Sequence, residues 1–573
     1  MELHLLVTES IANTKASLFG YFMPELILCV TILVMLLARL FPGIRKIDAS
    51  VWVLVGGLAA LFYVNRFPQL DAAATPERVE LFTGMLVHDS FTVFMRAFLI
   101  LFALLFAIFT RLSGVPDRDD AVDFYCMALG ATLGMCLMAS ANHLLMVFLA
   151  VEMASVPSYA LAAMLKGRRE SSEAALKYSI YGAGAAGVML YGISLLAGIL
   201  GSAHLPTMAS ELSRRLPELS SPETMVLVLG GLMTFVGLAF KLSAVPFHFW
   251  CPDVFEGASA EVNAFLSVAS KGAALALLIR VCMGLGLTHA EIHGPEKPAA
   301  VEQVVNVDGQ EGSALMAVAD EPIRDGGAAS FNSSDDGLGD VRHFMGLVIA
   351  LVATVTCTFG NLVAYGQTNI KRLLAYSTIA HAGYMMMPVS AALELAHVNP
   401  DASKQAVASL ALYIAIYLFM NLGAFAIVAF LRNTLRSEEI ADYSGLVRHS
   451  PGVAICFCII LFSLVGIPPL AGFVGKFAIF ASLTQGFTLA KQNYLMFLLI
   501  VGGLNTVISL FYYLRVIKVM TFESGEDRVP ATPFSMLSLS GAYTLLVTSP
   551  LLILFISWEP LSQWTKAAMR NLF

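Results

Sequence analysis

The sequence predicts an all-α polytopic membrane protein of about fourteen transmembrane helices, with two inverted five-helix repeats that each contain a broken helix. The first observation behind this is composition: 58% of the residues are hydrophobic, 13% are charged and the mean hydropathy is +0.76. Soluble proteins carry roughly 25% charged residues. The other two observations are a succession of long apolar runs and two matching interruptions by proline.

The apolar runs follow one another along nearly the whole chain and are separated by polar turns. A bilayer crossing needs about 20 apolar residues, and these runs meet that length. The predicted helices occupy residues 20–40, 48–64, 89–110, 121–140, 142–165, 174–200, 224–249, 259–288, 343–364, 371–392, 404–431, 452–484, 493–518 and 537–558.

An even number of crossings predicts that both termini lie on the same side of the membrane. One set of loops is richer in Lys and Arg per loop residue than the other set. Because cytoplasmic loops carry this excess, we expect both termini on the non-cytoplasmic side of the inner (plasma) membrane.

Two of the predicted helices are interrupted in corresponding ways, the first by Pro246 and the second by the run Gly466–Pro469. Proline removes a backbone donor and clashes with the preceding turn, so both helices should break within the membrane. Paired broken helices in two halves of a chain indicate an inverted-repeat transporter with its ion site at the breaks. The predicted units are N-terminal helices in 1–120, a first repeat in 121–288, an insertion in 289–342, a second repeat in 343–518 and a last helix with its loop in 519–573.

The insertion at 289–342 departs from this pattern because it is rich in Gly, Ala, Ser and Asp and has no sustained periodicity. That composition is typical of a flexible extramembrane linker, and a folded subdomain is the alternative. No residue in the insertion points to a function.

Several classes of function are excluded by what the sequence lacks. The net charge of −7 is spread over many loops without a basic stripe, which excludes nucleic acid as a partner. The eight cysteines have no CxxC spacing, and neither a metal-ligand spacing nor a glycine-rich nucleotide motif is present. We therefore expect no metal, redox cofactor or nucleotide in this chain.

Lysines inside the apolar runs are the main candidates for function. An ionised side chain at the bilayer centre costs about 2.5–3.5 kcal/mol on insertion scales, so such residues usually line an ion path. Lys241 and Lys271 flank the turn near Val254, at depths of roughly 20 and 26 Å from it at 1.5 Å per residue. We expect the two lysines to face one another on adjacent helices, where such a pair is suited to accepting and releasing protons. Snorkelling to an interface is the alternative, and their depth opposes it.

Three further charged residues extend this set. Glu152 lies mid-helix without a cation within one turn, so it can influence a lysine only across the bundle. Lys177 lies near the start of its helix, where snorkelling is a stronger alternative. Lys476 follows the second break among small residues and is the counterpart of Lys241 in the second repeat.

Two histidines complete the candidate proton path, because imidazole titrates near physiological pH and relays protons through either nitrogen. His248 follows the first break, and His381 lies mid-helix in the second repeat. A packing role is the alternative for each of them.

Several motifs carry a family resemblance. Five segments closely resemble the antiporter-like N subunits of bacterial proton-pumping NADH:quinone oxidoreductase, respiratory complex I. They are PEL at 24–26, VGLAFKLSAVPFH at 236–248, CPDVFEGA at 251–258, AFLSVASK at 264–271 and QTNIKRLLAYS at 367–377. The likeness covers nearly the whole chain, and the one departure is the insertion, which is longer than this family usually carries.

This resemblance implies a fourteen-helix subunit of the membrane arm whose proton path uses a glutamate, a bridging lysine and further lysines. Those positions fall on Glu152, Lys177, Lys241, Lys271 and Lys476. It also implies that NADH, FMN, iron–sulfur clusters and quinone are bound by partner subunits, and that the chain contacts other membrane-arm subunits, lipid and protons.

Two other functions remain to be compared with this one. A subunit of a multi-subunit cation/proton antiporter, or of a related hydrogenase-type complex, would use the same fold without NADH. A purely structural or assembly subunit would conduct nothing, and the row of buried lysines argues against it because a scaffold gains nothing from their insertion cost.

Overall fold

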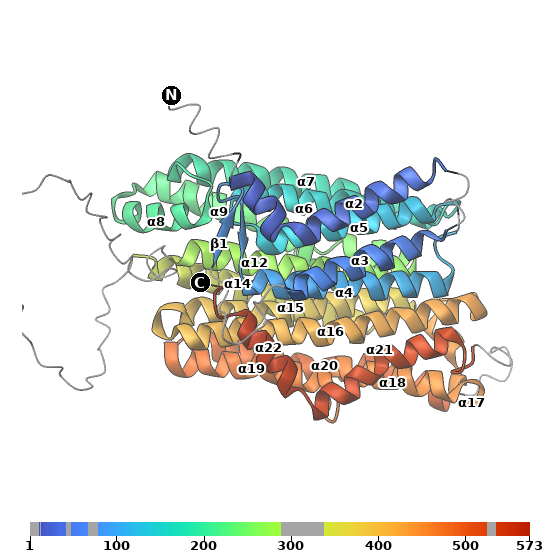
Figure 1. Cartoon of the computed structure of the whole chain (residues 1–573). Coiled ribbons are helices and arrows are strands. Elements are labelled where there is room, and N and C mark those ends of the chain that lie inside the picture. Colours follow the sequence, from blue (N-terminus) through green and yellow to red (C-terminus); the bar gives the residue numbers. More distant parts are fainter. Residues whose placement is uncertain are drawn as a thin grey trace, which may run out of the picture.

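The computed structural model describes residues 11, 13–41, 47–66, 78–117, 119–287, 337–523 and 534–572. The chain forms an elongated bundle of roughly parallel and antiparallel helices, as Figure 1 shows. The N-terminal elements are η1 (Ser17–Tyr21), α2 (Met23–Ala38), α3 (Ala49–Arg66), β1 (Val79–Leu81), β2 (Leu86–His88) and α4 (Ser90–Ser113). Most of the predicted insertion, residues 289–336, lies outside the described residues.

The helices that match the predicted first repeat come next along the chain. They are α5 (Ala121–Ser140), α6 (Leu144–Ala162), α7 (Arg169–Leu200), α8 (Leu205–Arg215), η4 (Leu216–Glu218), α9 (Ser221–Leu242), α10 (Trp250–Gly257), α11 (Ala260–Phe265), η5 (Leu266–Ser270) and α12 (Lys271–Gly286). The first predicted break is confirmed: α9 ends at Leu242, Ser243 adopts the left-handed conformation, and α10 begins only at Trp250.

The second half repeats this sequence of long, long, long and broken helices. Its elements are α14 (Gly339–Ala364), α15 (Ile370–Val398), α16 (Pro400–Leu435), η6 (Ile440–Tyr443), α17 (Leu446–His449), α18 (Pro451–Val465), α19 (Ala471–Ala490), α20 (Asn493–Phe522), α21 (Leu539–Ile556) and α22 (Glu559–Ala568). Here α18 ends at Val465 and is capped by Gly466, whose φ of 86° is readily available to glycine, and Pro468 and Pro469 separate it from α19. The repeat bounds at 121–288 and 343–518 stay a prediction.

Among the described residues, eleven helices are long and apolar enough to cross a membrane, or twelve if the bent pair at the N-terminus is one span. The predicted count of about fourteen is therefore not confirmed. The apolar helices Ala49–Val64 and Pro451–Val465 are too short for the test, and α15 is not among those that pass.

The centre of the bundle is formed by the span Ala260–Gly286 and by α16. In the most apolar 18-residue stretch of Ala260–Gly286, every residue is buried. In the corresponding stretch of α16, 94% of the residues are buried. By contrast, only 28% of the residues in the apolar stretches of α7 and of α20 are buried. These two helices therefore lie at the periphery and present leucines and aromatic rings to lipid. The second repeat therefore contacts the first through buried helices.

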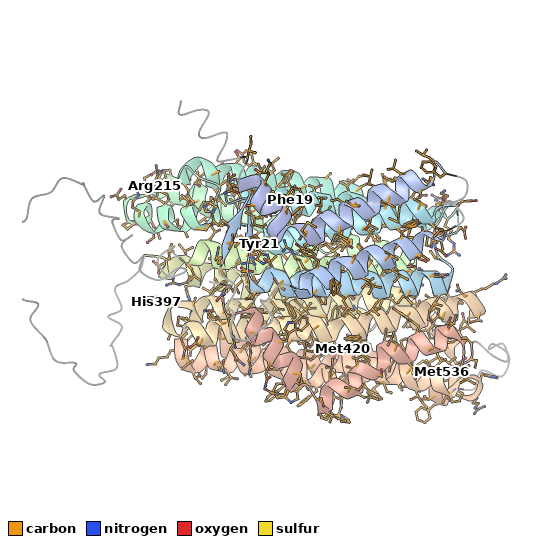
Figure 2. All side chains as sticks on the ribbon, in the orientation of Figure 1. Phe19, Tyr21, Arg215, His397, Met420 and Met536 are labelled. Atoms are coloured by element: carbon orange, nitrogen blue, oxygen red, sulfur yellow. The ribbon has the colours of Figure 1, made fainter. Side chains whose placement is uncertain are left out.

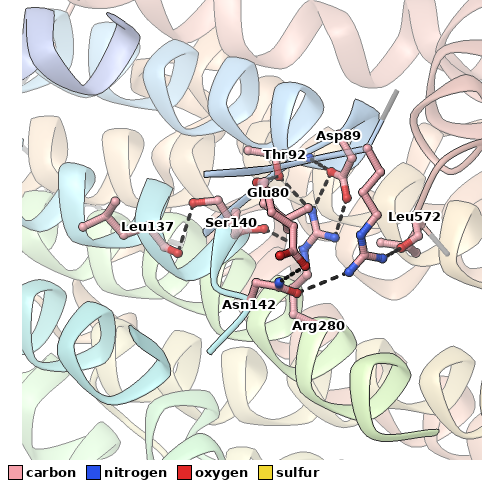
Figure 3. A network of polar contacts seen from close by, with 11 residues as sticks. Glu80, Asp89, Thr92, Leu137, Ser140, Asn142, Arg280 and Leu572 are labelled. Atoms are coloured by element: carbon pink, nitrogen blue, oxygen red, sulfur yellow. Dashed lines mark hydrogen bonds and ion pairs between the residues drawn. The ribbon is translucent and has the colours of Figure 1, made fainter. Parts of the chain in front are cut away.

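Two buried ion pairs hold the N-terminal helices in place: the first joins α2 to α4, and the second joins the start of α4 to α12. In the first, Arg96 Nε lies 2.5 Å from Glu25 Oε1, and both side chains are at most 1% exposed. In the second, Asp89 caps α4 by accepting from Thr92 N, and both of its oxygens accept from Arg280, at 2.5 and 2.6 Å (Figure 3). These four charges lie away from the broken helices, and no local pattern in the sequence marks them as ion pairs.

Glu80 of the β-hairpin and Asn142, which follows α5, lie near the second ion pair, as Figure 3 shows. Glu80 Oε1 accepts from Asn142 Nδ2 and lies 3.0 Å from His204 Nε2. The hydrogen bond with His204 lowers the pKa of the Glu80 carboxyl below its usual value. The hairpin thus connects α4, α5 and α8 at one end of the bundle.

Substitution of Asp89 by asparagine is expected to destabilise the protein by about 3–5 kcal/mol, because it leaves the guanidinium of Arg280 buried without its counter-charge. Thermal unfolding of the purified protein in mild detergent measures this effect. The control is Asp123→Asn, which breaks the Asp123–Arg39 pair, whose side chains are 48% and 40% exposed. It should cost under about 1 kcal/mol, and equal losses in both variants would contradict the prediction.

Candidate functional site

Lys241 lies in the last turn of α9 and is 1% exposed. Its Nζ donates to Ser155 Oγ on α6 at 3.1 Å. Glu152, one turn before Ser155, is the carboxylate that acts electrostatically on Lys241. The structure therefore brings Glu152 and Lys241 together across the bundle.

Lys177 has different partners. Its Nζ lies 2.7 Å from Asp253 Oδ2 and 2.9 Å from Glu173 Oε1, and the side chain is 37% exposed. Asp253 on α10 also accepts from Arg372 at 3.2 Å. In this conformation Lys177 thus belongs to an ion-pair network near the helix ends, and its bridging role between Glu152 and Lys241 stays a prediction.

Lys271 follows η5, a turn of π-helix, and is 1% exposed. Single π-helical turns inside α-helices are often found at functional sites. Its Nζ donates to the carbonyl oxygen of Thr378 on α15 at 3.1 Å. Lys241 and Lys271 therefore hydrogen-bond to different helices, α6 and α15, and the expectation that they face one another stays a prediction. Lys271 connects the two halves of the bundle.

His381 lies on α15 between two lysines. Its Nδ1 is 2.6 Å from the hydroxyl of Tyr413, and its Nε2 is 3.4 Å from the hydroxyl of Tyr513. Lys271 and Lys476 are the charged groups that act on it. The imidazole is thus hydrogen-bonded on both sides and lies within electrostatic reach of one lysine from each repeat.

Lys476 occupies the second break. Its Nζ donates to the carbonyl oxygen of Val465, the last residue of α18, at 2.8 Å. The final carbonyls of a helix have no partner within it and carry partial negative charge, so they suit a cation. The ammonium also lies 4.4 Å from the centre of the Tyr384 ring, a cation–π contact. These contacts hold a 3% exposed lysine inside the bundle.

His248 lies in the first break and is 4% exposed. It packs against the rings of Phe249 and Phe359, and its Nδ1 has no hydrogen-bond partner among the described residues. The structure does not connect it to the lysines, so its role in proton transfer stays a prediction.

Sequence reasoning missed the neutral partners of the charged residues. These are Ser155, Thr378, Tyr384, Tyr413 and Tyr513. One signal was available: Ser377, His381 and Tyr384 recur at helical spacing and so share one face of α15. No group of three His, Cys, Asp or Glu residues could hold a metal ion within the part of the chain that the structure describes.

Comparison with known proteins adds independent findings. Residues 141–293 and 334–509 match the family described as NADH:quinone oxidoreductase/Mrp antiporter, TM. The chain is 36% identical over 563 residues to the NADH-quinone oxidoreductase subunit N of Anaeromyxobacter sp. (strain Fw109-5), covering 97% of each chain. It is 33% identical over 522 residues to the subunit of the same name from Rhodospirillum rubrum, covering 90% of each.

Solved structures agree at the level of the fold. A chain of respiratory complex I from Thermus thermophilus with bound aureothin superposes with a TM-score of 0.66 at 26% identity, covering 94% of this chain and 98% of that one. A chain of the Mrp complex from Dietzia sp. DQ12-45-1b gives a TM-score of 0.68 at 18% identity, covering 97% of each. At that identity the second likeness shows the fold alone.

Proposed function

The chain belongs to the NADH:quinone oxidoreductase/Mrp antiporter family of transmembrane subunits, and from this premise we propose that it translocates protons in the membrane arm of NADH:quinone oxidoreductase. The observation that carries the proposal is a row of titratable groups that reaches from α6 to α19: the half-buried Glu152 and the buried Lys241, Lys271, His381 and Lys476. A buried charge in a membrane protein is costly and is retained where ions move.

The other subunits of the assembly supply the redox cofactors and the energy for proton translocation. NADH, FMN, iron–sulfur clusters and quinone are bound by partner subunits, and quinone reduction there provides the energy. Moving one charge against the membrane potential requires about 2.3 kcal/mol per 100 mV, and the coupling must therefore reach this chain through the neighbouring membrane-arm subunits. The chain lies in the inner (plasma) membrane with both termini on the non-cytoplasmic side, and residues 121–288 and 343–518 form its two antiporter-like repeats.

The residues act in sequence. Glu152 stabilises the protonated form of Lys241 while the two are close, and a change in their separation, with Lys177 as the bridging cation, releases the proton. Lys271 receives it and passes it through His381, which exchanges protons at either nitrogen, to Lys476. His248 contributes at the first break.

Substitution of Glu152 by glutamine tests the first step. Without the carboxylate, the charge of Lys241 no longer responds to its partner, and we expect proton pumping to fall by about tenfold or more. NADH-driven proton uptake by inverted membrane vesicles measures this, normalised to the amount of assembled complex. Glu170→Gln, at an exposed position of α7, is the matched control and should pump normally.

The same vesicles separate the proposal from a cation/proton antiporter. We expect proton uptake to require NADH and to be independent of Na⁺. Exchange of Na⁺ for H⁺ without NADH would assign the chain to an antiporter instead.

A further inference from the structure

A buried carboxylate near the end of α15 has no place in the path described so far. Glu394 Oε1 accepts from the hydroxyl of Tyr494 at 2.7 Å and lies 2.8 Å from His343 Nδ1, within hydrogen-bond distance. The Glu394 side chain is 8% exposed, whereas that of His343 is 42% exposed. One oxygen of a nearly buried carboxylate is thus connected to the bundle by a phenol and to the surface by an imidazole.

The position of Glu394 along α15 shows at which end of the bundle the cluster of Glu394, Tyr494 and His343 lies. Glu394 is thirteen residues beyond His381, or about 20 Å along the helix axis at 1.5 Å per residue. The opposite end of α15 carries Lys371, which pairs with Glu438 at 2.7 Å. Figure 2 shows His397, in the next turn after Glu394, at one end of the bundle and Met536 at the other. The cluster therefore lies at the end of α15 that is remote from the basic loops, which is the non-cytoplasmic end under the proposed orientation.

Hydroxyl groups extend from the cluster back toward the lysines. Ser390 Oγ donates to the Tyr494 hydroxyl at 3.3 Å and to the carbonyl oxygen of Gly346 at 2.8 Å. An added Cβ at Gly346 would lie 2.7 Å from the Tyr494 hydroxyl, so only glycine leaves room for this arrangement. Nearly two helical turns before Ser390, Tyr384 contacts the ammonium of Lys476 and hydrogen-bonds to Thr506 at 3.2 Å.

A polar atom on the neighbouring helix α19 is unsatisfied. Gln485 Oε1 on α19 is buried without a hydrogen-bond partner among the described residues. It is next to Gly486, where an added Cβ would lie 2.6 Å from Leu495 and 3.5 Å from Ala391, so it is level with Ser390 and Tyr494. Buried polar atoms are nearly always paired with protein or water, so this oxygen suits a bound water molecule at the level of Ser390 and Tyr494.

We propose that Glu394 and His343 form the proton-release site of this chain, an inference that rests on the proposed function. Lys476 loses a proton from its ammonium and is reprotonated through His381, and the hydroxyls of Ser390 and Tyr494 each accept one proton and pass one on. The Glu394 carboxylate becomes a carboxylic acid and then gives the proton to the imidazole of His343. The imidazolium releases it to solvent, and every group returns to its starting state.

The test uses the intact complex in proteoliposomes and compares proton pumping per assembled complex between variants. We expect Glu394→Gln to lower pumping by about tenfold, because the amide cannot take up a proton, and Glu394→Asp to retain most of it. Glu211→Gln, which loses a carboxylate paired with Arg214 and Arg215, is the control and should pump normally. His343→Ala is assayed with and without added imidazole. If His343 releases protons, imidazole from solution takes its place and restores pumping, which is the result we expect. If His343 only forms a structural ion pair, added imidazole has no effect on pumping.

Each outcome decides the question. Normal pumping by Glu394→Gln, or pumping by His343→Ala that imidazole does not raise, overturns the release site. If Lys476→Ala is impaired at the same time, the proposed function stands and only the release site fails. If Lys476→Ala also pumps normally, the proposed function itself fails. Should Glu394→Gln not assemble, the imidazole experiment on the half-exposed His343 gives the answer.

Discussion

Substitution of Lys241 by alanine is expected to abolish proton pumping by the assembled complex, with a loss of at least about tenfold. Lys241 is fully enclosed, hydrogen-bonds to Ser155 and is under the influence of Glu152. Alanine removes the titratable group and leaves the carboxylate without its cation. NADH-driven proton uptake in reconstituted vesicles measures the loss.

The Lys241→Arg variant tests whether Lys241 transfers a proton or only supplies a positive charge. Lys241→Arg retains a cation but cannot release its proton, since a guanidinium stays charged in proteins, so it should pump as poorly as Lys241→Ala. Lys518→Ala serves as the control, because Lys518 is 68% exposed on α20. Near-normal pumping by either Lys241 variant in an intact complex would contradict the assignment.

Substitution of Gly472 by alanine is expected to have the largest effect on the structure. An added Cβ there would lie 1.8 Å from the carbonyl oxygen of Ser463, so the start of α19 must move away from the end of α18. That movement separates Lys476 from the Val465 carbonyl that holds it. We expect a cost above about 3 kcal/mol, because backbone has to shift to relieve the contact.

The amount of folded subunit in the membrane and its thermal unfolding in detergent measure this cost. Gly503→Ala is the matched control, since no atom lies within 4 Å of an added Cβ at that helical position. Alanine there should stabilise α20 slightly, by roughly 0.5–1 kcal/mol. A Gly472→Ala protein as stable as wild type would show that the two halves of the broken helix are not packed as described.

Much of the fold could be predicted from the sequence because bilayer-length apolar runs are an unusually strong signal. The predicted helix at 121–140 coincides with α5, and the two breaks were located by proline and glycine, whose backbone effects are local. The elements that were missed, the β-hairpin, α8 and α22, are short and partly polar. They depend on packing against the bundle, which no local pattern records.

The candidate site could be predicted only in part. Buried lysines are visible in a sequence because a charge inside an apolar run is anomalous. The hydrogen-bond partners of these lysines are not visible in the sequence. Thr378 contributes only a backbone carbonyl, and Ser155 becomes a partner only because tertiary packing brings it next to Lys241. Contacts across the bundle likewise determine that Lys177 meets Asp253 and Glu173, and that Lys271 reaches α15.

The most direct test of the central claim is purification of the tagged chain in mild detergent, with identification of every co-purifying protein and an assay of NADH:quinone reductase activity. We predict that hydrophilic flavin and iron–sulfur subunits accompany the chain and that the preparation oxidises NADH with quinone. A chain that purifies alone, or only with other antiporter-like subunits and without redox activity, would contradict the account.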